Sequence, residues 1–285
     1  MKVLVLGVTG MLGSAVFKHL HASTNLSVWG TLRDARRATH FSERIRDSLI
    51  TNVDVLEYDS LVSAYARVQP DVVINCVGLI KQLADAKDPL SALPINAMLP
   101  HRLAKLCAIS GSRLIHISTD CVFSGQKGLY VEEDISDAED LYGKSKYIGE
   151  VHESPHAITL RTSIIGHELS SQYSLVDWFL AQSGTVKGYE KAIFSGLPTV
   201  ELSRVISDFV IPNPNLSGLF HVSAKPIDKL ALLRLLAGVY EKDIQIVPDS
   251  NVIIDRSLDS SKFKYATGYA PPAWPELIAT MQASR

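Results

Sequence analysis

The chain has 285 residues, of which 46% are hydrophobic and 20% are charged, and its formal net charge is −2. This length allows one large domain or a domain with an appended lobe, and the apolar content is enough to fill a core. The nearly balanced charge, without a dense run of Lys and Arg, argues against nucleic acid and anionic membrane surfaces as partners.

Targeting and redox signals favour a cytoplasmic protein. The apolar segment at residues 3–6 is too short for the core of a signal peptide, and we find no apolar stretch of about eighteen residues. Cys76, Cys107 and Cys121 lack a CxxC spacing, so the sequence predicts reduced thiols and neither a disulfide framework nor a zinc site. The sequence identifies no metal-ligating residue and leaves open a divalent ion at a subunit interface.

The first half of the chain alternates β-rich segments with helical patterns. Strands are predicted at residues 2–6, 27–31, 71–77, 113–118 and 156–161, and apolar residues recur at helical spacing in 11–20, 61–68 and 99–107. This β-α rhythm is typical of a parallel sheet with crossover helices. The nearly continuous apolar residues of 71–77 fit a strand that is covered on both faces.

The rhythm loosens after about residue 162, where Gly, Pro and Ser separate shorter elements. We therefore expect residues 1–162 to form the main domain. Residues 163–285 should form mainly a smaller lobe, with some segments, at about 200–223, returning to the main domain.

The first strand is followed by a GxxGxxG pattern, which opens the first predicted helix. Glycines there allow a tight turn and let the backbone approach a pyrophosphate, while the helix N-terminus offers free N–H groups. A glycine-rich turn without a ligand is the alternative, but the position in a β-α repeat favours dinucleotide binding. The predicted cofactor contacts in this turn are Gly7, Thr9, Gly10, Met11, Leu12 and Gly13.

The ends of the next strands predict further cofactor contacts. Arg33 follows the second strand, where an arginine suits a 2′-phosphate and an acidic residue a 2′-hydroxyl. Arg33, with Arg36 and Arg37, favours NADPH, whereas Asp34 keeps NADH open and a solvated charge cluster is a third interpretation. We also expect contacts with the adenine edge from Asp54 and Val55, and a lining of small side chains from Cys76, Val77 and Gly78.

Catalytic chemistry is predicted at the fifth strand and the helix that follows it. Thr119 and Asp120 directly follow that strand, at the edge where open α/β sheets bind ligands, and an ST-turn or a helix cap is the alternative interpretation. Tyr142 and Lys146 are four residues apart and share a helix face. A tyrosine has a reference pKa near 10, and we expect the Lys146 ammonium to lower that of Tyr142. A surface helix explains these two residues alone, but their order after the glycine turn favours a hydride-transfer site.

Six motifs carry a resemblance to the extended short-chain dehydrogenase/reductases, and within them to the dTDP-4-dehydrorhamnose reductases. They occur in the family's order over nearly the whole chain: GVTGMLG, STDCVFSG, LYGKSK, LRTSIIG, GLPT and DRSLDSSKF. The resemblance implies a Rossmann-type, doubly wound parallel sheet that binds NAD(P)H in residues 1–162. It also implies a smaller C-terminal lobe that binds a nucleotide sugar.

The family's reaction is the reduction of a 4-keto-6-deoxyhexose held on a nucleoside diphosphate, in deoxysugar and surface polysaccharide biosynthesis. Carried over to this chain, Tyr142 protonates the C4 oxygen, Lys146 bonds the nicotinamide ribose, and Thr119 bonds the reacting oxygen. Beyond these three catalytic residues, the resemblance implies substrate contacts at Asp120 and Cys121 and a passage near the nicotinamide at Thr162 and Ser163.

Two positions depart from the family's pattern. Cys121 and Ile164 stand where the family often carries aromatic residues, so the sugar pocket should differ and the product is open among rhamnose, a 6-deoxytalose and an N-acetylated 2,6-dideoxy sugar. Related 4,6-dehydratases carry a Glu where this chain has Cys121, which disfavours dehydration.

Several alternatives stay open. One is an epimerase that retains its NAD, and another is a regulatory subunit that binds a dinucleotide and a partner enzyme without turnover. The sequence does not choose between dTDP and UDP, nor between a monomer and a homodimer.

Overall fold

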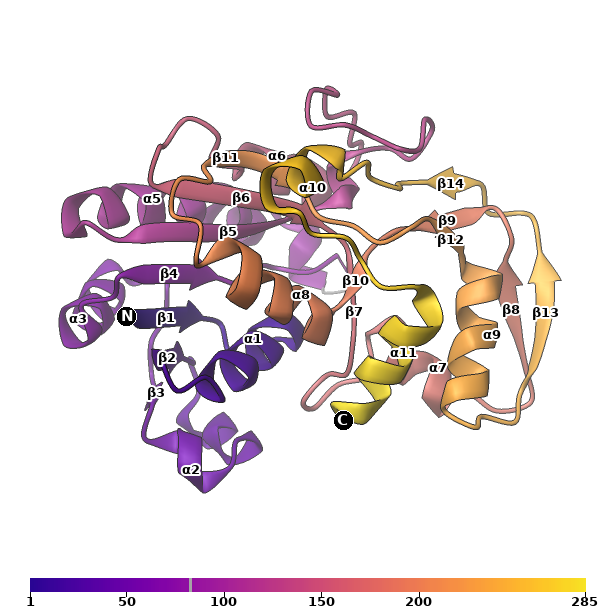
Figure 1. The fold of residues 1–285 in the computed structure, drawn as a ribbon, viewed down its shortest axis with the longest axis horizontal. Coiled ribbons are helices and arrows are strands. Elements are labelled where there is room, and N and C mark those ends of the chain that lie inside the picture. The colour runs from indigo at the N-terminus through magenta and orange to yellow at the C-terminus, as the bar shows by residue number, and fades with distance from the viewer. Residues whose placement is uncertain (82–83) are drawn as a thin grey trace.

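A seven-stranded parallel sheet forms the centre of the protein in the computed structural model, which describes residues 1–81 and 84–285 (Figure 1). Its strand order is β11-β6-β5-β4-β1-β2-β3, so the chain winds outward from β1 in both directions, as in a Rossmann fold. The strands are β1 (Lys2–Leu6), β2 (Ser27–Thr31), β3 (Leu49–Ile50), β4 (Val72–Asn75), β5 (Arg113–Thr119), β6 (Ala157–Thr162) and β11 (Gly218–His221).

Helices cover both faces of this sheet, because alternate residues of each strand point to opposite sides. In β1, Val3 and Val5 join the apolar cluster that contains α1 (Met11–His21) and α8 (Thr199–Val205). Leu4 and Leu6 join the cluster on the other side, with α3 (Tyr58–Val68) and α5 (Leu99–Ser110). The predicted doubly wound α/β fold is confirmed.

The predicted strands and the observed ones differ mainly at their ends. The segment predicted at 71–77 is a strand only over Val72–Asn75, because the chain then turns with the Val77 amide donating to the Asn75 side chain (3.1 Å). β11 pairs in parallel with β6, so residues 218–221 lie in the main sheet although they follow the lobe in sequence.

The second part of the chain builds a smaller lobe beside the carboxyl ends of the strands (Figure 1). β8 (Thr185–Tyr189) pairs with β13 (Gln245–Asp249), and β9 (Ala192–Phe194) pairs with both β12 (Ile227–Asp228) and β14 (Ile254–Asp255). β7 (Ile164–Ile165) pairs with β10 (Leu197–Pro198) where the chain leaves the main sheet.

The longest helix of this lobe, α9 (Lys229–Val239), packs on the β8–β13 pair and on α11 (Trp274–Ala283). The remaining helices are short: α2 (Glu43–Arg46), α4 (Pro89–Ala92), α6 (Leu141–Ile148), α7 (Leu175–Ala181) and α10 (Ser261–Thr267). Within residues 1–81 and 84–285, no helix has both the length and the apolar character needed to cross a membrane.

Candidate active site

The glycine turn between β1 and α1 is built for a close approach to the backbone. Gly7 has a φ of +80°, and a Cβ on Gly13 would lie 2.2 Å from the Gly7 carbonyl oxygen, so both positions need glycine for the turn itself. At Gly10, the N-cap of α1, a Cβ would meet no atom closer than 3.5 Å. The open side of Gly10, together with the free N–H groups of the first helical turn, suits a pyrophosphate.

The arginine cluster after β2 is divided among different partners. Asp34 accepts hydrogen bonds from the Arg36 backbone (3.0 Å) and from its guanidinium (2.7 Å), and these bonds lower the Asp34 pKa to about 2. The Arg37 guanidinium donates to the Ser170 hydroxyl (2.9 Å). Arg33 is exposed and makes no hydrogen bond or ion pair with the residues that the structure describes. Its guanidinium is therefore the one most available to a ligand phosphate.

Residues 53–55 lie beside the end of β2, because the Val53 amide donates to the Leu32 carbonyl (3.1 Å). The Asp54 carboxylate accepts a hydrogen bond from the Leu56 amide (3.0 Å), and the Val55 side chain is buried in the core. Their contact with the adenine edge stays a prediction.

The segment after β4 lies against the glycine turn. The Cys76 amide donates to the Leu6 carbonyl (3.2 Å), and a Cβ on Gly7 would come within 2.9 Å of a Val77 methyl group. Asn96, in a π-helical turn at Leu93–Met98, holds this segment by accepting from the Leu79 amide (2.9 Å). The structure thus brings Cys76, Val77 and Gly78 beside the predicted pyrophosphate site.

Thr119 lies at the carboxyl end of β5 and begins a 3₁₀ turn at Asp120–Val122. Its hydroxyl accepts from the Cys121 amide (3.1 Å) and donates to the Asp120 carboxylate (3.2 Å). Helix α6 approaches this turn closely because Gly143 has no side chain: a Cβ there would lie 2.2 Å from the Cys121 carbonyl oxygen. That contact places Tyr142 next to Thr119, near enough for Thr119 to affect its pKa.

The pKa of Tyr142 is shifted in the direction opposite to the prediction. Burial raises the pKa of Tyr142, with Cys121 adding to the rise, and Lys146 is absent from the causes of this shift. The net shift is therefore opposite to the predicted one, because desolvation of the phenolate outweighs any lowering by Lys146. The Lys146 ammonium donates to the Ile117 carbonyl (2.8 Å), and its burial lowers the Lys146 pKa to about 8. At neutral pH Tyr142 is a neutral phenol and Lys146 is mostly charged.

Thr162, the last residue of β6, and Ser163 lie beside Thr119 and Asp120. Thr162 is the register partner of Thr119, and its hydroxyl donates to the Ser163 carbonyl (3.1 Å). Ser163 is close enough to Asp120 to lower the pKa of that carboxyl, although burial raises it more strongly.

Two cations of the small lobe face Asp120 and were missed by the sequence prediction. Arg256, after β14, donates to the Phe123 carbonyl (2.7 Å) and approaches the Cys121 sulfur (3.8 Å). Burial lowers the pKa of Lys229, at the start of α9, while Asp120 acts in the opposite direction. Arg256 was visible only as part of the DRSLDSSKF motif, and Lys229 had no sequence signal.

A pocket of about 580 Å³ opens next to these groups. Its size is typical of a site for a small organic ligand. Residues from the 3₁₀ turn region, from the segment before α6 and from the lobe line it, among them Lys81, Cys121, Asp140, Ile253 and Arg256. Lys81 and Asp140, the N-cap of α6, form an ion pair at its edge.

The doubly wound parallel sheet with a glycine turn after β1 defines a Rossmann-type, dinucleotide-binding fold. Within this class, the family model for the RmlD substrate binding domain matches residues 1–226, and the chain belongs to that family. The resemblance expected from the six motifs is confirmed.

Individual relatives include proteins of two kinds. A dTDP-4-dehydrorhamnose reductase of Aggregatibacter actinomycetemcomitans is 25% identical over 306 residues, which cover 99% of this chain and 98% of that protein. Methionine adenosyltransferase 2 subunit beta of Mus musculus is 26% identical over 314 residues, covering 97% of this chain and 88% of that protein. A crystal structure of dTDP-4-dehydrorhamnose reductase from Bacillus anthracis str. Ames in complex with NADP superposes with a TM-score of 0.80, at 19% identity and with 99% of each chain covered.

Proposed function

We propose that this protein is a reductase that transfers hydride from NADPH to the C4 keto group of a nucleotide-linked 4-keto-6-deoxyhexose. The observation that carries the proposal is the position of Tyr142 next to Thr119 at the carboxyl edge of the sheet, with Lys146 one turn farther along the same helix. A pocket of about 580 Å³ is lined by Cys121 and Arg256, close to these groups. Membership of the RmlD family supports this substrate class. The reaction would serve deoxysugar and surface polysaccharide biosynthesis.

The cofactor-binding residues are proposed to follow the strand ends from the glycine turn to Ser163. The open side of Gly10 and the uncommitted guanidinium of Arg33 fit a dinucleotide with a 2′-phosphate, and NADH is the alternative donor. When bound, the reduced nicotinamide supplies the hydride. The residues proposed to hold the cofactor are Gly7, Thr9, Gly10, Met11, Leu12, Gly13, Arg33, Asp54, Val55, Cys76, Val77, Gly78, Tyr142, Lys146, Thr162 and Ser163.

Tyr142 is proposed as the proton donor to the developing C4 alkoxide. The phenol of Tyr142 is protonated at neutral pH, which is the form that a general acid needs. Thr119 lies beside it and can donate a second hydrogen bond to the same oxygen. Lys146, charged below about pH 8, stabilises the negative charge that Tyr142 acquires on giving up its proton.

The nucleotide sugar is proposed to enter between the 3₁₀ turn and the small lobe. Arg256 and Lys229 bring two positive charges to this place, which suits a diphosphate. Asp120 and Cys121 are the proposed sugar contacts, and the thiol of Cys121 offers less surface for stacking than an aromatic ring would.

Absorbance of NADPH tests the proposal when the pure protein is offered 4-keto-6-deoxyhexoses linked to dTDP and to UDP, with NADH measured alongside. We expect one NADPH to be consumed for each sugar reduced, with one of the two nucleotides preferred. Binding of NADPH without consumption with any of these sugars would contradict the proposal. NAD that copurifies with the protein and is recycled would indicate an epimerase.

A second candidate function is that of a non-catalytic subunit. It is favoured by the relationship to methionine adenosyltransferase 2 subunit beta, which extends over 97% of this chain. Copurification with the methionine adenosyltransferase of the same source organism, combined with an absence of NADPH consumption, would favour this candidate over the reductase.

A further inference from the structure

A buried carboxylate follows the helix that carries Tyr142 and Lys146. Glu150 comes directly after the α6 C-cap, Gly149, and its side chain is fully buried. Carboxylates are rarely buried without a partner, so the contacts of Glu150 indicate what it does.

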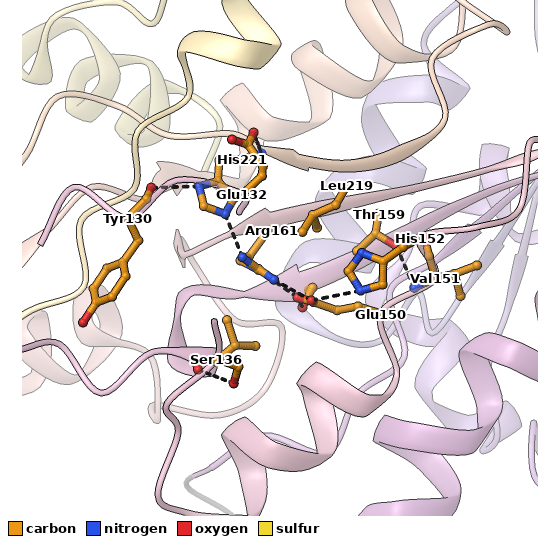
Figure 2. A network of polar contacts seen from close by, with 12 residues as sticks. Tyr130, Glu132, Ser136, Glu150, Val151, His152, Thr159, Arg161, Leu219 and His221 are labelled. Atoms are coloured by element: carbon orange, nitrogen blue, oxygen red, sulfur yellow. Dashed lines mark hydrogen bonds and ion pairs between the residues drawn. The ribbon is translucent and has the colours of Figure 1, made fainter. Parts of the chain in front are cut away.

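Both oxygens of Glu150 accept strong hydrogen bonds, as Figure 2 shows. Oε1 accepts from the Ser118 hydroxyl (2.6 Å) and from Arg161 Nε (2.9 Å), and Oε2 accepts from Arg161 Nη2 (2.6 Å). The imidazole of His152 lies 3.6 Å from Oε2. The bonds from Arg161 form a bidentate pair, the geometry in which arginine holds a carboxylate most firmly.

The hydrogen-bond partners of Glu150 lie on two neighbouring strands of the main sheet, close to the candidate active site. Ser118 and Arg161 are register partners on β5 and β6, one residue before Thr119 and Thr162. Glu150 therefore connects the end of α6 to the two strand positions that immediately precede the site. A shift of this carboxylate would move Tyr142 and Thr119 relative to each other.

Arg161 is itself fixed on its far side. Its Nη1 donates to His221 Nε2 (2.9 Å), and His221 Nδ1 donates to the Tyr130 carbonyl (3.0 Å), which requires a neutral imidazole. Burial lowers the His221 pKa to about 3, in agreement with this tautomer. The Arg161 guanidinium also lies over the Phe123 ring, with 4.9 Å to its centroid. On its far side, Arg161 is thus held by a His221 that stays neutral at neutral pH.

The charge of Glu150 acts on Lys146 as well. The Lys146 ammonium donates to the Ile117 carbonyl (2.8 Å), and Glu150 accepts from the hydroxyl of the next residue, Ser118 (2.6 Å), so both side chains meet neighbouring positions of β5. In agreement, Glu150 raises the Lys146 pKa, against the larger lowering by burial. The other titratable groups near Lys146 are His116 on β5, whose own pKa Lys146 lowers, and Tyr142 on the same helix. Arg161 is absent from the causes of the Lys146 shift.

We infer that Glu150 is a positioning residue of the proposed reductase, whose buried carboxylate acts on the Lys146 ammonium four residues earlier in the chain and ties the end of α6 to the strand ends beside Thr119. This inference rests on the proposed function for its catalytic consequence. The effect of Glu150 on the titration midpoint of Lys146 can be measured in the absence of turnover.

The test is the titration of Lys146 by NMR in protein labelled with ¹³C-lysine, with Lys146→Met identifying the resonance. We expect a midpoint near pH 8 in the unaltered protein and a midpoint lower by about one pH unit or more in Glu150→Gln, because an opposite charge has been withdrawn. An unchanged midpoint in Glu150→Gln would overturn the inference. If Glu150→Gln does not fold, since Arg161 would then lose its buried partner, the charge-balanced Glu150→Gln/Arg161→Met replaces it. Because this variant also withdraws the Arg161 charge, we expect the midpoint to fall by a smaller interval, and an unchanged midpoint would again overturn the inference.

Glu201→Gln is the matched control. Glu201 is also buried, pairs with Arg204 (2.7 Å) and accepts from the Tyr269 hydroxyl (2.8 Å), but it lies on α8 and does not contribute to the Lys146 shift. Its variant should leave the Lys146 midpoint where it is, and an equal shift in both variants would show a general loss of structure and overturn the inference.

Kinetics provide the second measurement. The alkaline limb of the kcat profile with NADPH and the keto sugar should move to lower pH in Glu150→Gln by the same interval as the Lys146 midpoint. An unaltered limb would remove the catalytic part of the inference. A complete lack of turnover in the unaltered protein would instead refute the proposed function, and the NMR titration would still decide whether Glu150 controls Lys146.

Discussion

Replacing Gly143 by alanine tests whether the contact between α6 and the 3₁₀ turn places Tyr142. The added Cβ would lie 2.2 Å from the Cys121 carbonyl oxygen and 2.7 Å from the Ala138 Cβ, and ordinary contact begins at about 3.4 Å. The helix must therefore move away from the turn by roughly 1 Å. A displacement of about this size between catalytic groups lowers turnover by roughly a hundredfold.

The stability change in Gly143→Ala is the difference of two effects. Overpacking costs about 1–3 kcal/mol, and the better helix propensity of alanine returns at most about 1 kcal/mol, so we expect a net loss of up to about 3 kcal/mol. A chain of this size should then unfold at a temperature lower by a few degrees, at about 2–4 °C per kcal/mol.

The matched control is Gly238→Ala. Gly238 also lies in a helix, α9, but a Cβ there would meet nothing within 4 Å. This variant should gain up to about 1 kcal/mol in stability and keep full activity. Thermal unfolding followed by circular dichroism, together with NADPH oxidation, measures both quantities. A Gly143→Ala protein as active as the unaltered one would refute the argument that this contact positions Tyr142.

Four further predictions concern the cofactor and the proton donor. Tyr142→Phe should reduce turnover by about a hundredfold or more with nearly unchanged NADPH affinity, and unchanged turnover would remove its role as the acid. Arg33→Ala should weaken NADPH much more than NADH in a fluorescence titration, whereas equal losses would exclude a 2′-phosphate contact. Gly10→Val should prevent cofactor binding in a folded protein, because the side chain would occupy the open side of the turn. Turnover should fall as the pH rises through about 8, where Lys146 loses its proton, and a flat profile from pH 7 to 9 would contradict that requirement.

The sequence predicted those parts of the site that depend only on local sequence patterns. The glycine turn follows directly from a strand and opens a helix, and Tyr142 and Lys146 share a face because of helical spacing. The strand ends then meet at one edge because the sheet is parallel. These features need no knowledge of the distant chain.

The remaining parts depend on contacts between distant segments. Lys229 and Arg256 reach Asp120 only because the small lobe folds over the strand ends, and no periodicity in their own segments indicates this. Glu150 looks in sequence like an ordinary charged residue after a helix, although the structure buries it completely. The error for Tyr142 has the same origin, since its pKa depends on how much water the folded chain excludes.

The return of the chain to the main sheet bears on whether the two lobes are separable modules. β6 is buried along its whole length and pairs with β5 on one side and with β11 on the other. A fragment ending at Thr162 would leave β6 as an open, apolar edge, which recruits other chains and promotes aggregation. It would also remove His221 from the buried Arg161. The dinucleotide-binding half should therefore not be obtainable as a well-behaved fragment, and domain exchange with relatives should succeed only if residues 218–221 are transferred with it.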